Sequence, residues 1–223
     1  DSTSGGEGLR SGIASLVTRS HSADFNPANW SGIASVVTRC YSAASRRDVG
    51  VAGMVGGTTS RGRGAVAIAH QYENVMVDEP ADGVARITLN RPERLNALTH
   101  GLVRDLHDAL DLVDASHETR AVIVTGAGRG FCAGLDLTGF GTVPGTENFG
   151  AAQRGMAVQQ YIAELVHHMR DVRQPIISAI NGAAAGGGFA IACASDVRYC
   201  GASAKFGTAF VRLGISGCDI GVS

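Results

Sequence analysis

Two short apolar runs, each followed at once by a glycine-rich segment, constrain the fold of this 223-residue chain most strongly. AVIVT (Ala121–Thr125) precedes GAGRGFCAGLDL, and PIISAI (Pro175–Ile180) precedes NGAAAGGGFAIA. The length and β-branching of both runs predict buried strands, and each glycine segment is expected to lead into a helix. Glycine costs about 0.8–1.0 kcal/mol relative to alanine in a helix interior. Three glycines in succession therefore call for a packing or functional reason.

Further strands and helices are predicted from Tyr72 onward. They are a hairpin around Asp82-Gly83, a helix from the cap Thr99 to about Ala115, a loop over Thr142–Gly150, a helix over Val158–Val172, and a third buried strand over Asp196–Cys200. The hairpin follows from alternating apolar and polar residues, and the helices from apolar residues spaced three and four apart. Strands that alternate with helices predict an α/β fold of right-handed ββα or βαβ turns.

Residues 1–70 differ from residues 71–223 and are predicted to be a separate, low-complexity N-terminal extension. This part is rich in Ser, Gly, Ala and Arg and contains a tandem repeat. SGIASLVTRSHSA (Ser11–Ala23) returns as SGIASVVTRCYSA (Ser31–Ala43) with ten of thirteen residues identical. Two copies are too few for a solenoid. Two interpretations stay open, a disordered or weakly helical extension and an organellar transit peptide, whose typical composition this part shares.

Composition excludes several classes of protein. The net charge of −1 argues against nucleic acid or an acidic membrane surface as a partner, and no apolar run reaches the length of a membrane span. The five cysteines are an odd set without CxxC spacing, which argues against a disulfide framework or a zinc site and favours a reducing compartment. His167 and His168 have no further ligand at metal spacing and are interpreted as half-exposed helix residues.

The location is predicted to be cytoplasmic, in a bacterium. This rests on 18 Arg against a single Lys and on the lack of a secretory signal. A mitochondrial matrix is the alternative, because of the N-terminal composition.

The two glycine segments also suggest chemistry. Backbone N–H groups at the start of a helix are unpaired donors with a positive dipole behind them. Two such segments side by side can direct two N–H groups at one oxygen, an oxyanion hole that would stabilise an enolate beside a thioester carbonyl. Tight strand-to-helix packing is an equally good explanation of the glycines at this point. A dinucleotide site is disfavoured, since Phe131 stands where GxGxxG needs glycine.

The chain resembles the crotonase superfamily, also called the enoyl-CoA hydratase/isomerase family, from about residue 72 to its end. Five motifs carry the resemblance, in this order: ITLNRPERLNAL (Ile87–Leu98), GRGFCAGLDL (Gly128–Leu137), PIISAINGAAAGGG (Pro175–Gly188), SDVRYC (Ser195–Cys200) and KFGTAFVRLGI (Lys205–Ile215). The resemblance implies a spiral of repeated ββα units and acyl-CoA substrates, with coenzyme A as part of the substrate and no separate cofactor. It also implies a homotrimer or a hexamer built from two trimers.

The resemblance assigns roles to several residues. The backbone N–H groups of Leu135 and Gly187 would form the oxyanion hole. The main chain around Ala133 would contact the adenine of coenzyme A, and Gly134, Gly186 and Gly188 would let the thioester approach. Arg91 and Arg94 are candidates for the phosphates, although surface arginines are more often simply solvated.

The sequence departs from the family pattern at the catalytic positions. Hydratases of this family carry two glutamates that activate water and protonate carbon. Here the corresponding positions hold Ala190 and Phe210. Asp219 is the first candidate for a replacement acid or base and Asp136 the second; a capping role is the alternative for both. Cys132 lacks an evident base that would make it a nucleophile.

A second departure is the expected lack of the C-terminal helical region, because the chain stops at Ser223. The predicted function is enoyl-CoA hydration. One alternative is isomerisation or another CoA-enolate reaction, and another is a non-catalytic acyl-CoA binder or an inactive truncated product.

Overall fold

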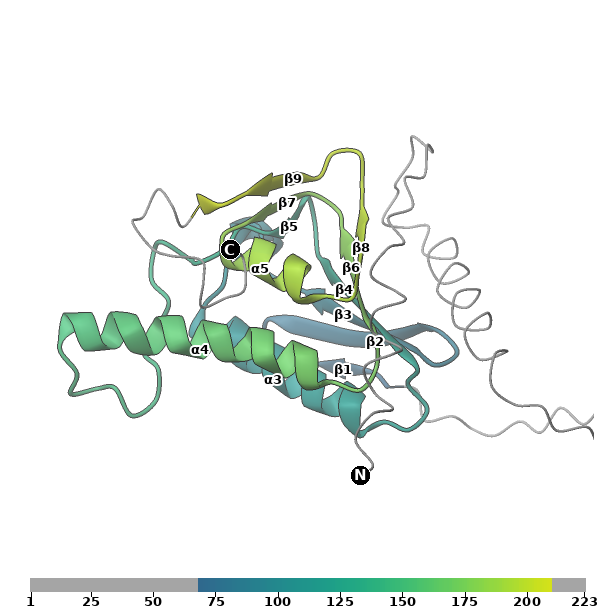
Figure 1. Ribbon diagram of the computed structural model, residues 1–223, viewed down its shortest axis with the longest axis horizontal. Helices are drawn as coiled ribbons and strands as arrows, with labels where there is room; N and C mark the ends of the chain where they lie inside the picture. The colour runs from purple at the N-terminus through teal and green to yellow at the C-terminus, as the bar shows by residue number, and fades with distance from the viewer. Residues whose placement is uncertain (1–67, 210–223) are drawn as a thin grey trace, which may run out of the picture.

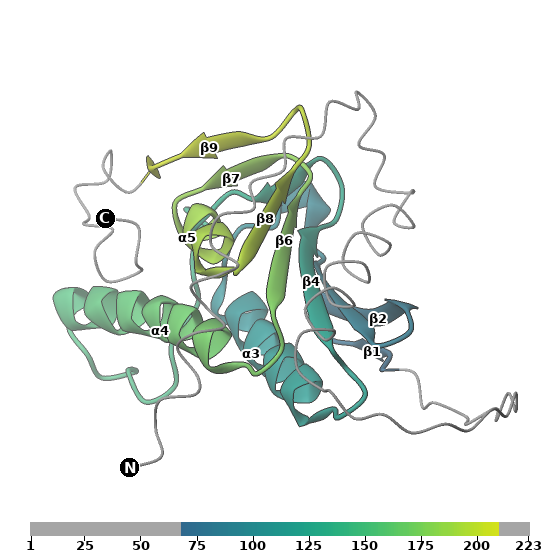
Figure 2. The same cartoon turned by 45° about the vertical axis from the view of Figure 1, so that its right-hand side comes forward.

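The computed structural model describes residues 68–209, which form two sheets packed with three α-helices (Figures 1 and 2). Residues 1–67, which hold the tandem repeat, lie outside the described part. So do residues 210–223, which include Phe210 and Asp219. The predicted N-terminal extension and the predictions for these two residues therefore stay predictions.

The larger sheet has six strands in the order β1-β2-β3-β4-β6-β8. Its strands are β1 (His70–Gln71), β2 (Val75–Ala81), β3 (Val84–Leu89), β4 (Ala121–Gly126), β6 (Ile176–Ile180) and β8 (Val197–Cys200). Strands β1 to β3 pair antiparallel, and β3, β4, β6 and β8 pair parallel. The predicted hairpin is confirmed, with Gly83 at φ +69 in its turn. The three strands predicted to be buried are β4, β6 and β8. Burial is confirmed for β4 and β6 and wrong for β8, whose residues are half-buried or exposed because it is the edge strand of the sheet.

A second, smaller sheet was not predicted. It consists of the parallel strands β5 (Gly130–Cys132), β7 (Ala183–Ala185) and β9 (Lys205–Gly207). Each strand has only three residues, too few to show an alternating pattern in the sequence. Two turns of the chain, β4–β5–α4 and β6–β7–α5, each add one strand to each sheet and then a helix.

Three α-helices of the described part follow the strands. Helix α3 (His100–Ala115) begins after Thr99, whose Oγ1 accepts a hydrogen bond from the Leu102 amide at 3.3 Å, so the predicted cap is confirmed. Helix α4 (Ala151–Asp171) begins earlier than the predicted Val158. Its first turns project past α3 and are exposed, so they lack the apolar spacing that would have revealed them (Figure 2). Helix α5 (Gly187–Ala194) opens within the glycine triplet.

The core lies between the larger sheet and the helices. Helix α3 buries the apolar stripe that its spacing predicts: Leu102, Val103, Leu106, Ala109, Leu110 and Val113. Ile162, Leu165 and Met169 of α4 join the same cluster, together with alternate residues of β2, β3 and β4. The same cluster includes Phe131 and Cys132 of β5 and Ala190, Ile191, Ala192 and Ala194 of α5, which packs on β5.

Candidate active site

The two glycine segments lie side by side, as the sequence predicts. A β-carbon built on Gly134 would be 2.6 Å from the Ala185 carbonyl oxygen and 3.3 Å from the Gly187 nitrogen. Gly134 has φ +88 and Gly186 has φ +49, conformations that other residues rarely adopt. The backbone at residue 134 can therefore approach the start of α5 only because it carries no side chain.

The Leu135 amide is oriented by a bridge to Leu98. The Leu98 amide donates to the Gly134 carbonyl at 2.7 Å, and the Asp136 amide donates to the Leu98 carbonyl at 2.9 Å. In a trans peptide the N–H points opposite to the preceding C=O, so the Leu135 N–H points away from Leu98. Among residues 68–209 it has no hydrogen-bond acceptor. The helix expected to follow this segment does not form; a turn follows instead.

The Gly187 amide is the first of helix α5. The first four N–H groups of a helix have no partner within it. The Gly186 amide is taken up by the Gly207 carbonyl of β9 at 2.9 Å, whereas the Gly187 amide has no acceptor in the described part of the chain. Two free donors, at Leu135 and Gly187, thus flank the contact between Gly134 and α5.

Each glycine of the triplet is required for a different physical reason. Gly186 adopts the positive φ described above. A β-carbon on Gly187 would be 2.6 Å from Leu98 Cδ1, and one on Gly188 would be 2.1 Å from the Cys132 carbonyl oxygen. Tight packing of α5 on β5 therefore accounts for Gly188, while Gly187 combines close packing with a free amide. The packing and functional explanations apply to different glycines.

Asp136 is buried and its carboxylate is fully engaged. Oδ1 accepts from the Thr138 amide at 3.0 Å and from the Thr138 hydroxyl at 2.6 Å, and Oδ2 accepts two bonds from the Arg91 guanidinium, each 3.1 Å long. The Thr138 hydroxyl, with the Thr138 amide and Arg91, lowers the pKa of this carboxyl. Its predicted acid–base role stays a prediction, and the geometry shows a carboxylate held in its charged form.

The two arginines near the site behave differently. Arg91 is bound within the fold, because its Nη1 also donates to the Ala97 carbonyl at 2.6 Å. Arg94 ends the short 3-10 helix η1 (Pro92–Arg94), and its exposed side chain has no ion-pair partner among the described residues. Of the two, Arg94 is therefore the one free to meet a phosphate, as the resemblance implies.

Asn96 is a buried structural residue whose role was not predicted from the sequence. Its Nδ2 donates to the carbonyls of Ala127, Gly130 and Phe131, and its Oδ1 accepts from the Arg91 amide at 2.8 Å. Its φ of +56 is one that asparagine tolerates better than most residues. An Asn amid otherwise apolar neighbours in RLNAL was the available signal. The side chain anchors the strand that leads to Leu135.

Three further candidates are placed by the structure. Ala133 is half-buried and its N–H donates to the Leu95 carbonyl at 3.0 Å, so only its carbonyl is available to an adenine amino group. Ala190, at the position of one of the two family glutamates, is buried within α5. Complete burial raises the pKa of the Cys132 thiol to about 12, so this thiol is a poor nucleophile, in line with its lack of an evident base.

The two adjacent histidines of α4 differ, as their spacing implies, but one has an unforeseen partner. His167 is exposed, and His168 faces α3, where its Nδ1 lies 2.6 Å from that of His107. Within residues 68–209, no group of three or more His, Cys, Asp or Glu side chains has the arrangement of a metal site. None of the helices described is long and apolar enough to cross a membrane.

The family follows from comparison with known proteins. A family model described as enoyl-CoA hydratase/isomerase matches residues 79–222, more than half of the chain. The chain belongs to the enoyl-CoA hydratase/isomerase family. The predicted resemblance is thereby confirmed.

Two curated members of the enoyl-CoA hydratase/isomerase family illustrate its range. A probable enoyl-CoA hydratase, echA12, of Mycobacterium leprae is 39% identical over 149 residues, covering 67% of this chain and 51% of the relative. The 1,2-epoxyphenylacetyl-CoA isomerase of Escherichia coli is 40% identical over 133 residues, covering 60% and 50%. The chain spans about half the length of these relatives.

Solved structures of the family confirm the predicted crotonase-like α/β fold. A probable enoyl-CoA hydratase/isomerase from Mycobacterium abscessus matches with a TM-score of 0.60 and 34% identity over 67% of this chain and 54% of that one. A putative enoyl-CoA hydratase from Streptomyces coelicolor gives 0.59 and 35% identity over 73% and 58%. The spiral of ββα units predicted for this chain is therefore the fold that it shares with the family.

Proposed function

We propose that this chain binds an acyl-CoA thioester whose carbonyl oxygen accepts hydrogen bonds from the Leu135 and Gly187 amides. One observation carries the proposal: Gly134 packs against the Gly187 nitrogen, and the amides on either side of this contact lack acceptors within residues 68–209. Donors fixed in place before the reaction stabilise the negative charge of an enolate without further reorganisation. Gly134, Gly186 and Gly188 keep side chains out of this space, and Ala133 and Arg94 contact the coenzyme A portion.

The reaction we propose is hydration of an enoyl-CoA, with isomerisation or another CoA-enolate reaction as the alternative. The names of the M. leprae and E. coli relatives correspond to these two reactions. Hydration needs both a base for water and an acid for carbon, whereas isomerisation can use one proton carrier. Ala190 cannot transfer a proton. Asp219 is the first candidate carrier and Asp136 the second.

A non-catalytic acyl-CoA binder is the candidate from a different class. Two observations favour it: a methyl side chain at Ala190, and a carboxylate at Asp136 whose oxygens are occupied by Thr138 and Arg91. Such a protein would retain the two amide donors and would lack turnover.

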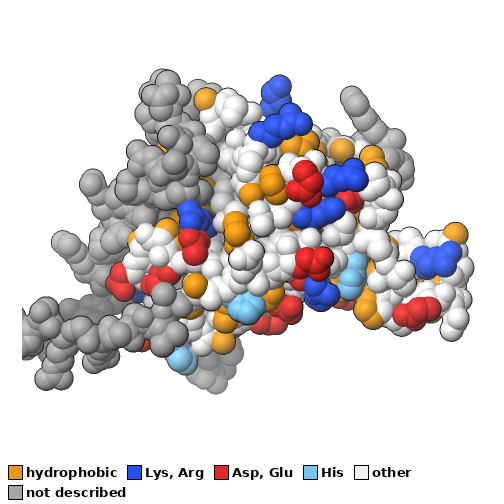
Figure 3. All heavy atoms as spheres, turned by 180° about the vertical axis from the view of Figure 1, so that it is seen from behind, with side chains coloured by type: hydrophobic (Ala, Val, Ile, Leu, Met, Phe, Trp, Pro, Cys, Tyr) orange, Lys and Arg blue, Asp and Glu red, His pale blue; other side chains and the backbone are white. Residues whose placement is uncertain are grey.

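The assembly and location are part of the same proposal. Coenzyme A enters as part of the substrate and no separate cofactor is needed, since the amides supply the charge stabilisation. The face in Figure 3 interleaves acidic and basic side chains, which supports a partner other than nucleic acid. A homotrimer or hexamer rests on the family resemblance, and a cytoplasmic location rests on the free thiols of Cys132, Cys193 and Cys200.

The first test follows the absorbance of the conjugated thioester of crotonyl-CoA. Two substitutions at one position separate the donor from the packing. Gly187→Ala and Gly187→Pro both add a β-carbon beside Leu98, but only proline removes the N–H. Proline is also tolerated at the first position of a helix. The proposal expects catalysed loss of absorbance that survives in the alanine variant and is abolished in the proline variant.

Other outcomes would redirect the assignment. Equal turnover in the folded alanine and proline variants would refute the two-amide hole. Folded wild-type protein that binds crotonyl-CoA in calorimetry without consuming it would refute hydration of this substrate and favour the binder. If Asp219→Asn leaves the rate of an active protein unchanged, the proton-carrier role of Asp219 is wrong.

A further inference from the structure

We infer that the ion pair of Arg91 and Asp136 is a positioning device that holds the Leu135 amide in its donor orientation. This inference rests on the proposed oxyanion function. It gives Asp136 a role through Leu135, in place of proton transfer.

The guanidinium of Arg91 joins the two segments that the Leu98–Leu135 bridge brings together. Its Nη1 donates to the Ala97 carbonyl at 2.6 Å, one residue before Leu98. Nη1 and Nη2 both donate to Asp136 Oδ2, one residue after Leu135. The two side chains are 18% and 6% exposed, so water screens the pair little.

The second carboxylate oxygen is fixed from the other side. Asp136 Oδ1 accepts from both the amide and the hydroxyl of Thr138, and the Asp136 amide donates to the Leu98 carbonyl. Backbone and side chain of this residue are therefore held by three different segments. A carboxylate that accepts four hydrogen bonds is stabilised in its charged form and is a poor proton donor.

The position of Leu135 makes this rigidity relevant to the site. On its N-terminal side lies Gly134 at φ +88, a residue with wide backbone freedom. On its C-terminal side lies the clamped Asp136. The Leu98 bridge sets the direction of the Leu135 N–H, and the Arg91 hydrogen bonds to the Ala97 carbonyl and to Asp136 hold both sides of that bridge in place. A small misplacement of a donor can reduce a rate by up to about 100-fold.

The test measures polarisation of a bound carbonyl directly. The probe is butyryl-CoA labelled with ¹³C at the thioester carbonyl, which has no double bond to hydrate. Isotope-edited infrared difference spectra of the full chain would show the stretch at lower frequency when both amides donate. We expect most of this shift to be lost in Asp136→Asn, which keeps the shape of the side chain and removes its charge. The same loss is expected in Arg91→Lys, which keeps the positive charge and removes the planar guanidinium with its two parallel N–H donors. In a protein that turns over crotonyl-CoA, kcat should fall about 10- to 100-fold with little change in KM.

Arg173 and Asp114 provide a control pair of the same residue types, with more exposed side chains. Arg173 also bonds both a carboxylate and a backbone carbonyl, those of Asp114, but at the opposite end of α3 from the site. Arg173→Lys and Asp114→Asn should leave the carbonyl frequency unchanged, and they should change the unfolding midpoint little because this pair is exposed. A purely structural role for the Arg91 pair predicts the same behaviour for both pairs.

The outcomes separate this inference from the proposed function. A wild-type shift that persists in folded Asp136→Asn and Arg91→Lys would overturn the inference and leave the oxyanion hole standing. Bound butyryl-CoA with an unshifted carbonyl in the wild type would overturn the oxyanion hole, and the inference with it. Loss of the shift at the Arg91 pair alone supports both.

Discussion

The Nδ1 atoms of His107 and His168 lie 2.6 Å apart where helix α3 packs against helix α4. At this distance only one of the two nitrogens can carry a hydrogen. His168 Nε2 lies 3.1 Å from Asp111 Oδ1 and donates to it. Whichever ring donates between the two Nδ1 atoms, the contact leaves no place for a second proton there, so the two imidazoles are not both charged.

This contact predicts a loss of stability in mild acid. Burial, followed by the neighbouring His168, lowers the pKa of His107 below 6.5, although Asp111, Glu164 and Asp108 oppose the shift. The unfolded chain then takes up a proton at a higher pH than the folded chain does. Stability is therefore complete above about pH 6.5 and falls as the pH drops from there toward the folded pKa. Urea unfolding at pH 7.5, 6.5 and 5.5 measures this dependence.

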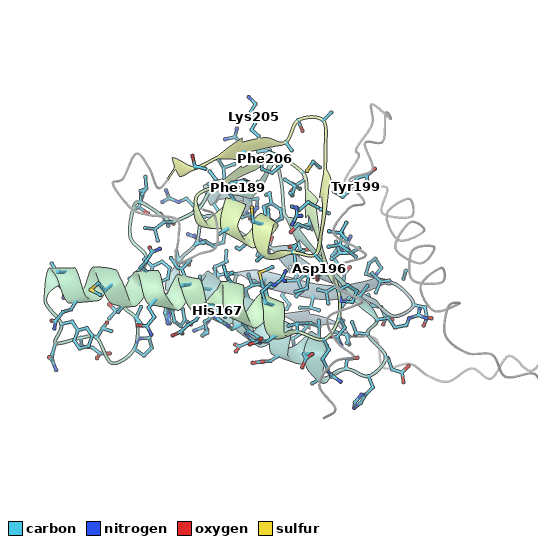
Figure 4. All side chains as sticks on the ribbon, viewed as in Figure 1. His167, Phe189, Asp196, Tyr199, Lys205 and Phe206 are labelled. Atoms are coloured by element: carbon cyan, nitrogen blue, oxygen red, sulfur yellow. The ribbon has the colours of Figure 1, made fainter. Side chains whose placement is uncertain are left out.

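The matched variants are His107→Leu and His167→Gln. The first removes the titrating ring and should flatten the dependence on pH in this range. The second changes the exposed histidine of α4, seen in Figure 4, and should leave the dependence as in the wild type. An unchanged slope in His107→Leu would show that other groups cause the acid sensitivity.

Glycine-to-alanine substitutions at Gly188 and Gly155 should have opposite effects. At Gly188 the new β-carbon would be 2.1 Å from the Cys132 carbonyl oxygen, so α5 must move away from β5, at a cost of about 1–3 kcal/mol or more. At Gly155, in the exposed first half of α4, a β-carbon meets nothing within 4 Å, and alanine should stabilise by about 0.5–1 kcal/mol. Thermal unfolding compares the two. A neutral Gly188→Ala would show that the α5–β5 contact can relax.

Asn96→Ala should be strongly destabilising, by about 2–4 kcal/mol, because it removes four buried or half-buried hydrogen bonds; of the three carbonyls involved, that of Gly130 keeps a bond from Asn181 Nδ2. Asn96→Gly separates the loss of the hydrogen bonds from the strain of the backbone, since glycine accepts the φ of +56 without penalty. It should recover about 1 kcal/mol relative to alanine. Denaturant unfolding of both variants gives these differences. A loss below 1 kcal/mol in either would mean that the loop reorganises around the missing side chain.

Thiol labelling should distinguish the cysteines of the described part. Cys200 is exposed, although partial burial of its thiol raises its pKa, whereas Cys132 is fully buried with its pKa raised to about 12. At pH 8 iodoacetamide should modify Cys200 in the native protein and leave Cys132 unmodified. Mass spectrometry of the peptides reads the result, and labelling in urea should remove the difference. Rapid native labelling of Cys132 would indicate local opening of β5.

The sequence was sufficient where a pattern lies within one segment. The stripe of α3 and its Thr99 cap, the hairpin at Asp82-Gly83, and the strands β4 and β6 all follow from local spacing or composition. The start of α4 and the three-residue strands of the second sheet did not follow. Exposed turns and very short strands carry too little apolar periodicity to be recognised.

By itself the sequence determined the family motifs, the buried strands, and the glycine segments that bear the candidate amides. Only the tertiary structure decided that Gly134 lies against the Gly187 nitrogen and that Arg91 is bound to Asp136 and Arg94 is not. The contact between His107 and His168 was likewise decided by the tertiary structure alone. Arg91 and Asp136 are 45 residues apart in the chain, and the two histidines 61 apart. Such contacts depend on how the two sheets and the helices pack, because the partner of a polar side chain is chosen by the whole fold and leaves no periodic trace in its own segment.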